Sequence, residues 1–473
     1  MASQIRTEEK SVPFFILPFS AECATSLEVL RRNHIDALEL IKGEDELASY
    51  CYTASTSWPH FSQFRSVVTG ANLTELLDAL RSEPLCSSKM HDVMKENSEA
   101  ESNGPTPLSF LFSGAGAEFF QMGLELYQTC PSYRSHFDDI NSHLMDLDGI
   151  DLLRWFRDGE EIPLYRLLST FALEYSLLKM WEDWGVRPTL CVVGHSFGEL
   201  AAAVATGVLS LPTAARLIVY IRQTILEKVI PGSMLLLLTD ETTTISLINQ
   251  YTKRKVMGNE TGDEWIDVSI INTPKQTVVS GPTHVITNFA TFVPPHYIRK
   301  AKPIDGIVHP FHSRSMEQGS TEFKKYIEKL EFSSLNDELK YISSMYGKQM
   351  EVSQNLDVSY WVQWYYKPAQ FIDSATSAVA LGAQLFLELS SQPILSKLMK
   401  INCPEANLFC IPSLKKNISN WQTLMEAVAS LYLHRIEVDW TKIWNSLNDD
   451  CRCIKPVPHL MPAYSLQGEP ALG

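Results

Sequence analysis

The chain lacks a hydrophobic run long enough to cross a bilayer, and it lacks an excess of basic residues. Its longest apolar runs, such as residues 234–238 (MLLLL), are far shorter than the roughly 20 residues that a membrane helix needs. Its 40 Lys and Arg residues are outnumbered by 55 Asp and Glu residues, which gives a net charge of −15. The absence of a long apolar run argues against a membrane protein. The acidic charge argues against nucleic acid as the main partner, because phosphate groups bind to basic surfaces.

A secretory signal and a disulfide framework are not expected either. Residues 1–10 (MASQIRTEEK) are polar, and no apolar segment of the signal-peptide type follows them. The nine cysteines are an odd number scattered over 473 residues, which is typical of reduced thiols. No cluster of residues has convincing metal-ligand spacing, so no metal site is expected. These features predict a cytoplasmic protein.

The order of apolar runs and amphipathic segments predicts several units. An apolar content of 45% is enough for a large core, and domains of about 150 residues would give two to four of them. Short strand-like runs alternate with long helical ones, which favours an α/β fold with a largely parallel, α/β-hydrolase-like sheet. Within it, strands at 233–238, 265–271, 276–280 and 297–301 and helices at 241–251 and 283–292 have the order βαββαβ, which predicts an inserted ferredoxin-like subdomain.

The predicted boundaries follow from these patterns. We expect a small α/β linker domain, a flexible linker, a large subdomain in two parts that flank the small one, and a tail. Their ranges are 1–85, 86–106, 107–231 with 304–411, 232–303, and 412–473.

The strongest chemical motif is residues 194–198 (GHSFG). It follows a strand-like run and precedes a helix of small residues, which is the context of a nucleophile elbow. The glycines permit a tight turn and a close approach of helix and strand, so Ser196 is the candidate nucleophile. The backbone N–H of Phe197, at the start of the helix, is a candidate oxyanion donor.

A serine nucleophile needs a base, and residues 308–316 contain two histidines. His312, which precedes a serine, is the better candidate, while His309 is an alternative that the spacing does not exclude. Arg222 lies within an apolar helical segment, so its charge needs a carboxylate or phosphate partner. That partner is either a substrate or a nearby glutamate in a structural salt bridge.

Taken in order, these segments resemble the acyltransferase (malonyl-CoA:acyl-carrier-protein transacylase) domains of polyketide and fatty acid synthases. The resemblance covers nearly the whole chain, with residues 1–85 similar to the linker that follows a ketosynthase and the tail similar to a post-acyltransferase linker. The matching segments are 110–123 (FLFSGAGAEFFQMG), 194–200 (GHSFGEL), 270–281 (IINTPKQTVVSG), 309–313 (HPFHS), 360–371 (YWVQWYYKPAQF) and 388–395 (ELSSQPIL).

The resemblance implies a Ser-His dyad of Ser196 and His312, with the histidine oriented by a backbone carbonyl near Lys367. It implies that Arg222 grips the free carboxylate of malonyl, that the segment around His309 selects malonyl, and that His195 and Asn272 support the pocket. The expected reaction moves malonyl from malonyl-CoA to the phosphopantetheine thiol of an acyl carrier protein, with no cofactor bound. A ketosynthase or other synthase domain, in cis or in trans, is a further expected partner.

One departure from the family pattern bears on the chemistry. The glutamine that helps form the family's oxyanion hole is Ala115 here, which leaves only a backbone N–H beside that of Phe197. An altered acyl group therefore remains an alternative, in a starter-unit transacylase or an editing acyl hydrolase that uses the same dyad. An α/β-hydrolase esterase and a structural docking module of a megasynthase are further alternatives.

Overall fold

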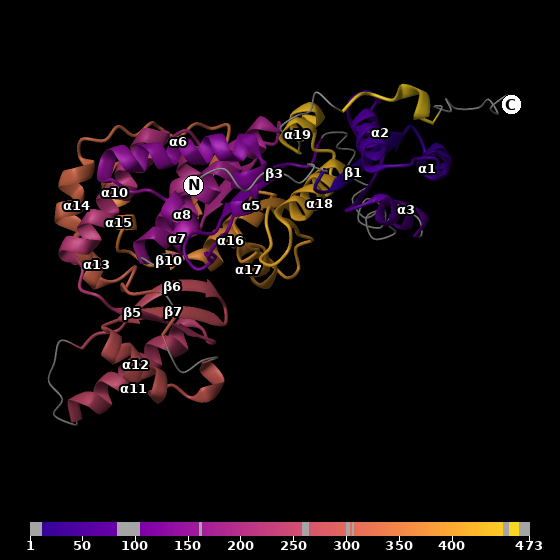
Figure 1. Ribbon diagram of the computed structural model, residues 1–473. Coiled ribbons are helices and arrows are strands. Elements are labelled where there is room, and N and C mark those ends of the chain that lie inside the picture. The colour runs from indigo at the N-terminus through magenta and orange to yellow at the C-terminus, as the bar shows by residue number, and fades with distance from the viewer. Residues whose placement is uncertain are drawn as a thin grey trace.

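The computed structural model describes residues 12–82, 105–159, 163–257, 264–298, 303–304, 307–447 and 454–462. Three β-sheets organise these residues, with six, four and two strands. In Figure 1 the four-stranded sheet and its helices lie below one end of the helical body, and the two-stranded sheet lies at the opposite end. Most of the linker predicted at 86–106 lies outside the described residues.

The six-stranded sheet forms the centre of the large subdomain. Its order is β12-β11-β3-β4-β8-β9, and all neighbours are parallel except β8 and β9. This confirms the predicted largely parallel α/β sheet. The strands are β3 (Leu108–Phe112), β4 (Cys191–Gly194), β8 (Lys340–Ser343), β9 (Lys348–Gln349), β11 (Leu385–Leu389) and β12 (Phe409–Pro412).

Helices cover both faces of this sheet, so its central strands are buried on both sides. Leu111 faces a core with α16 (Phe371–Ala380) and α17 (Leu395–Asn402), whereas Phe110 and Phe112 face the larger core on the other side. The other helices of this subdomain are α5 (Leu124–Thr129), α6 (Pro131–Asp148), α7 (Leu153–Asp158), α8 (Pro163–Asp183), η1 (Ser196–Gly198), α9 (Glu199–Ala205), α10 (Leu211–Lys228), α13 (Arg314–Gln318), α14 (Ser320–Ile327) and α15 (Val358–Trp364).

The four-stranded sheet forms the small subdomain and has the order β10-β6-β7-β5. Figure 1 shows its two long helices on the side away from the large subdomain. Its elements are β5 (Ser233–Leu237), α11 (Glu241–Met257), β6 (Asp267–Thr273), β7 (Gln276–Gly281), α12 (Thr283–Phe292), η2 (Pro295–Tyr297) and β10 (Ala369–Gln370).

One predicted element of this subdomain is wrong in detail. A strand was expected at 297–301, but Tyr297 ends a 3-10 turn, Ile298 is not in a strand, and 299–301 lie outside the described residues. The segment still runs beside β5, since Leu238 N–H donates to the carbonyl of Tyr297. The fourth strand of the sheet is instead β10, which comes from far along the chain and pairs in parallel with β6. Two residues cannot be recognised as a strand from sequence periodicity.

The two ends of the described chain pack together. The N-terminal unit pairs β1 (Phe15–Ala21) with β2 (Phe64–Gly70) in antiparallel register and adds α1 (Ala24–Leu38), α2 (Glu44–Thr56) and α3 (Leu73–Arg81). The C-terminal elements are α18 (Asn420–Leu433), α19 (Trp440–Leu447) and η4 (Pro458–Leu460). Helix α18 packs against both strands of the N-terminal sheet, and Figure 1 shows the indigo and yellow ends side by side.

Arg65 fixes this contact. Its guanidinium lies 4.6 Å from the centre of the Tyr432 ring, and it donates to the carbonyls of Phe61 (2.9 Å) and Tyr432 (3.2 Å). It also pairs with Glu437. Since Arg65 is buried, these contacts are shielded from water. No helix within the described ranges has both the length and the apolar character that crossing a membrane requires.

We expect Arg65→Ala to loosen the N-terminal unit from the body. The change removes the cation–π contact and leaves two carbonyls without their donor, so the local stability should fall by about 2 kcal/mol. Hydrogen exchange of the amides in β1 and β2 measures this loss. Arg32→Ala, at an exposed residue of α1, is the control, and equal exchange rates in the two variants would contradict the prediction.

Candidate active site

The candidate site lies at the carboxyl ends of the parallel strands, where ligands bind in open α/β sheets. Strand β4 ends at Gly194, and the chain turns sharply through His195 and Ser196 into η1 and α9. Ser196 has a φ of +52°, a conformation that non-glycine residues rarely adopt. Such local strain persists only where the surroundings hold it, and it is frequent at active sites.

Gly194 and Gly198 make this turn possible. A Cβ on Gly198 would collide with the backbone of Phe112 in β3, and a Cβ on Gly194 would collide with the backbone of Glu199. Helix α9 therefore approaches the sheet more closely than any side chain would permit. This is the structural reason for the glycine spacing that the sequence shows around Ser196.

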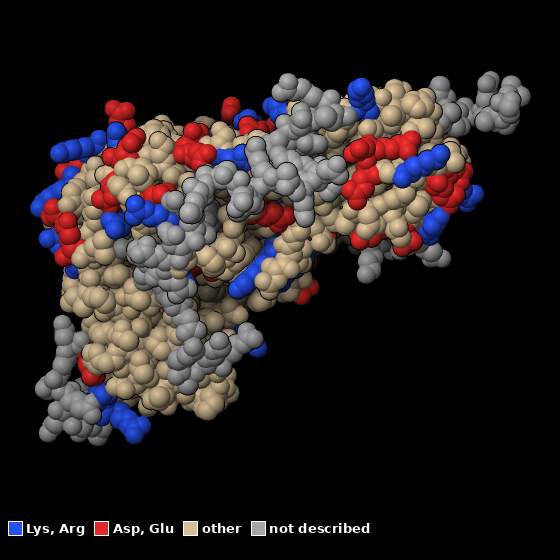
Figure 2. Space-filling model, in the orientation of Figure 1, with Lys and Arg blue, Asp and Glu red and all other residues tan. Residues whose placement is uncertain are grey.

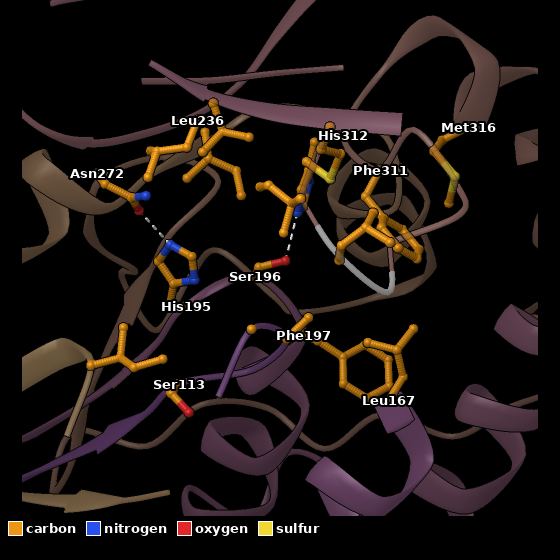
Figure 3. Close-up of a pocket in the computed structure, with 18 of the residues that line it drawn as sticks. Ser113, Leu167, His195, Ser196, Phe197, Leu236, Asn272, Phe311, His312 and Met316 are labelled. Atoms are coloured by element: carbon orange, nitrogen blue, oxygen red, sulfur yellow. Dashed lines mark hydrogen bonds between the residues drawn. The ribbon is translucent and has the colours of Figure 1, made fainter. Parts of the chain in front are cut away.

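The structure brings Ser196 and His312 together from positions 116 residues apart in the chain. The Oγ of Ser196 lies 2.6 Å from Nε2 of His312, as the dashed line in Figure 3 marks. The Nδ1 of His312 lies 2.7 Å from the carbonyl oxygen of Lys367. Because a carbonyl only accepts hydrogen bonds, Nδ1 carries the proton and Nε2 presents its lone pair to Ser196.

Burial keeps His312 neutral. Desolvation lowers the pKa of its imidazole to about 4, although the hydrogen bond to Lys367 acts in the opposite direction. The neutral ring is the form that can accept a proton from a hydroxyl group. Together, Ser196, His312 and the carbonyl of Lys367 have the geometry of a nucleophile, a base and an orienting group.

His195 and Asn272 connect the two subdomains beside this pair. The Nε2 of His195 lies 2.9 Å from Oδ1 of Asn272, which comes from β6 of the small subdomain. Figure 3 shows this contact on the other side of Ser196 from His312. The backbone carbonyl of Asn272 also accepts a hydrogen bond from Asn402 in α17. These bonds hold the small sheet against the edge that carries Ser196.

A cavity of about 300 Å³ opens over Ser196 between the two subdomains. Phe197 and Ala115, the expected backbone donors, both line it. Its other lining residues are mostly apolar, and they are Ser113, Gly116, Leu167, His195, Ser196, Ile221, Met234, Leu236, Ile270, Asn272, Gln276, Val278, Ile304, Ile307, Phe311, His312, Met316, Trp364, Tyr365, Ile394 and Leu398. Figure 3 shows Leu236, Phe311, Met316 and Leu167 around the Ser196 hydroxyl.

Two candidates are placed elsewhere. His309 is buried but does not line the cavity, so of the two histidines it is His312 that meets Ser196. Arg222 also does not line the cavity, although its neighbour Ile221 does. Its Nη1 lies 2.5 Å from Oδ2 of Asp148, at the end of α6. The structural salt bridge that the sequence allowed for Arg222 is therefore present, but its acidic partner is an aspartate from a distant part of the chain and not a nearby glutamate.

Three buried glutamates support the site, and local sequence patterns assign none of them a role. Glu174 in α8 accepts hydrogen bonds from Gly114 N–H (2.9 Å) and Ser113 Oγ (3.3 Å), which fixes the loop that carries Ala115. Burial raises the pKa of Glu174 to about 8. Glu388 at the end of β11 accepts three backbone N–H groups at the start of α17. A single acid within an apolar run, as in residues 171–175 (FALEY) and 385–389 (LFLEL), was the available signal.

Glu199 is the third carboxylate and fixes the nucleophile turn directly. It accepts hydrogen bonds from Ser344 Oγ (2.5 Å), Ser344 N–H (2.7 Å), Tyr341 OH (2.7 Å) and Tyr360 OH. The same Ser344 Oγ accepts the backbone N–H of Ser196 at 3.2 Å. Glu199 thus acts on Ser196 through one intervening hydroxyl group.

The described part of the chain holds no group of three or more His, Cys, Asp or Glu residues with metal-binding geometry. The chemistry that the arrangement supports is attack by a serine hydroxyl with a histidine base.

We expect Glu199→Gln to destabilise the protein by about 3 kcal/mol. The side-chain NH2 group of glutamine is a donor, and it would face hydroxyl and backbone N–H groups that already donate to this position. Urea unfolding measures the loss, and labelling of Ser196 by a serine-directed fluorophosphonate should slow in parallel. Glu317→Gln, at an exposed residue of α13, should change the unfolding free energy by less than about 0.5 kcal/mol. If the two variants unfold alike, the buried network does not have this role.

Comparisons with known proteins place this chain in a family. A model of the acyl transferase domain matches residues 109–438. Among curated relatives, the non-reducing polyketide synthase PKS19 of Phaeosphaeria nodorum is 24% identical over 463 residues, which are 96% of this chain and 25% of that protein. The polyketide synthase GfsA of Streptomyces halstedii is 27% identical over 80% of this chain and 5% of its own length. The chain thus spans a quarter or less of these two relatives.

Solved structures agree in fold. The acyl transferase domain of ZmaA has a TM-score of 0.72 at 21% identity and covers 92% of this chain and 97% of its own. The acyltransferase domain of the second module of the salinomycin polyketide synthase has a TM-score of 0.65 at 25% identity, covering 90% and 95%. These domains have a hydrolase-like and a ferredoxin-like subdomain, as predicted here. The chain therefore belongs to the acyl transferase domain family, as an acyltransferase domain of the polyketide synthase type.

Proposed function

We propose that this chain transfers an acyl group from a coenzyme A thioester to the phosphopantetheine thiol of an acyl carrier protein, through an ester on Ser196. The observation that carries the proposal is the 2.6 Å contact between Ser196 Oγ and Nε2 of a neutral, oriented His312. A hydroxyl group at neutral pH is a weak nucleophile, and a base in hydrogen-bond contact is what activates it.

The first half-reaction begins with Ser196 and His312, which lie in contact. Ser196 Oγ attacks the thioester carbonyl while His312 Nε2 takes its proton, and the backbone N–H groups of Phe197 and Ala115 stabilise the oxyanion. The C–S bond then breaks, and His312 returns the proton to the departing coenzyme A thiolate. In the second half-reaction a carrier thiol attacks the Ser196 ester, His312 takes the thiol proton, and the proton returns to Ser196 Oγ.

The carrier protein is the proposed acceptor, and local positive charge would help its docking on an acidic chain. Lys416 lies with its Nζ 5.2 Å from the ring of Phe119, on the loop that carries Ala115 and Gly116 into the cavity wall. The basic side chains of residues 253–255 lie instead in the last turns of α11, at the tip of the small subdomain, where Figure 2 shows Lys and Arg together. A third basic segment, residues 299–302, lies outside the described residues. Of the two basic segments that the structure describes, the proposal favours the one with Lys416 for docking.

The identity of the acyl group is a separate question. The resemblance suggested malonyl because of Arg222, yet this arginine is paired with Asp148 and does not line the cavity. The apolar cavity favours the alternative of a starter-unit transacylase, which uses the same dyad. A water molecule as acceptor would make the same site a hydrolase. Assays with and without a phosphopantetheinylated carrier protein separate transfer from hydrolysis.

We expect incubation with acyl-CoA thioesters to add one acyl mass to the intact protein, at Ser196. A panel of acetyl-, hexanoyl- and malonyl-CoA covers the proposed acyl groups, and mass spectrometry reads the adduct. Ser196→Ala should abolish it, and His312→Ala should slow its formation by at least about 100-fold. Ser353→Ala, at an exposed serine, should leave it unchanged. No adduct from any thioester, or an adduct that survives in Ser196→Ala, would overturn the proposed function.

We expect the rate of acylation to stay constant from neutral pH down to about pH 5. Only neutral His312 can accept the proton, and burial lowers its pKa to about 4, so the rate should fall only as the pH approaches 4. Rates measured between pH 4 and 8, with circular dichroism to monitor folding, test this. An acidic limb near pH 6.5, the ordinary value for histidine, would contradict the assignment of a desolvated base.

A further inference from the structure

One short segment of the chain contacts both members of the Ser-His dyad. Trp364, the last residue of α15, donates a hydrogen bond from its indole Nε1 to the backbone carbonyl of Ser196 at 3.2 Å. Three residues later, the carbonyl of Lys367 accepts the hydrogen bond from Nδ1 of His312 at 2.7 Å. The nucleophile and the base are therefore both held by the carboxyl end of α15.

Helix α15 is itself anchored to the buried hydrogen-bond network beside the nucleophile. Tyr360, one helical turn before Trp364, donates from its hydroxyl group to Glu199 and to Ser343 Oγ, the latter at 2.8 Å. Tyr360 and Trp364 are both buried, so water does not compete for these hydrogen bonds. Because a buried and satisfied polar network is rigid, Trp364 offers Ser196 a donor in a fixed position.

The bond from Trp364 acts on a strained part of the backbone. Ser196 has a φ of +52° and His312 has a φ of +55°, so both members of the dyad adopt a conformation that non-glycine residues rarely occupy. The carbonyl of Ser196 accepts the backbone N–H of Glu199, and Trp364 is its second donor. The N–H of Ser196 donates to Ser344 Oγ at 3.2 Å. Side chains from outside the turn therefore hold Ser196 through both its N–H and its carbonyl group.

We propose that Trp364 is a positioning residue of the dyad: its indole N–H sets the separation of Ser196 Oγ and His312 Nε2 by holding the nucleophile against the segment that orients the base. The inference rests on the proposed function, in which this dyad transfers the acyl group. Trp364 lines the cavity, but it acts on the reacting oxygen only through the backbone of Ser196. Because a small displacement of reacting groups costs a large factor in rate, the loss of this one bond should slow the reaction.

Two substitutions separate the indole N–H from the bulk of the side chain. Trp364→Phe keeps an aromatic ring in the cavity wall and removes the donor. Trp364→His is smaller, but its ring can present an N–H group where the indole presents Nε1. Trp184→Phe is the matched control, because it removes another buried indole donor, whose bond to Ser446 Oγ is 3.0 Å long. Neither Trp184 nor Ser446 lines the cavity.

The test measures how fast a serine-directed fluorophosphonate labels Ser196 on the full chain, over a range of probe concentrations at neutral pH. We expect Trp364→Phe to lower the limiting rate about tenfold and to change the half-saturating concentration by less than about twofold. Trp364→His should label at least about threefold faster than Trp364→Phe. Trp184→Phe should label at the wild-type rate, although it should unfold at a lower urea concentration.

The outcomes separate this inference from the proposed function. Equal limiting rates in Trp364→Phe and the wild type, an equal loss in Trp184→Phe, or no recovery in Trp364→His would overturn the positioning role. Acyl transfer would survive each of these results, because its own test is the mass adduct that acetyl-, hexanoyl- or malonyl-CoA leaves on the wild type. Absence of that adduct with every thioester, while the probe still labels Ser196, would overturn the proposed function, and the comparison of variants would still decide the role of Trp364.

Discussion

The site depends on a strained turn that a buried carboxylate holds in place. Ser196 has a positive φ at the end of β4, and its backbone N–H donates to Ser344 Oγ, which in turn donates to Glu199. Glu199 is fully buried, yet the hydroxyl and backbone N–H groups of β8, α15 and the loop after β8 compensate for the loss of water. One carboxylate thus ties three elements to the nucleophile, and the position of Ser196 relative to the rest of the sheet follows from it.

The histidine is positioned by the junction of the two subdomains. The carbonyl of Lys367 orients His312, and two residues later β10 begins and joins the small sheet beside β6. Strand β6 also carries Asn272, the partner of His195. A shift of the small sheet would therefore move both the base and the side chain next to the nucleophile. The inserted subdomain forms one wall of the cavity and also fixes the geometry of the dyad.

The sequence was sufficient for those features that depend on local patterns. The GHSFG turn, the alternation of strands and helices and the inserted small subdomain all have short-range signatures, and the fold confirms the α/β architecture. It was not sufficient for contacts between distant segments. Asp148 and Arg222 are 74 residues apart, and nothing near either of them identifies the other. The two-residue strand β10 and the role of Glu174 depend equally on tertiary packing.

Desolvation links the base to the choice of substrate. The burial that lowers the pKa of His312 to about 4 keeps its imidazole neutral and ready to accept a proton. A malonyl carboxylate in the same cavity, without a cation beside it, would favour the protonated imidazole and raise that pKa. An uncharged acyl chain leaves the electrostatic environment of His312 unchanged and needs no cation beside it. A cavity with an apolar lining, outside which Arg222 is paired with Asp148, is therefore suited to apolar acyl groups.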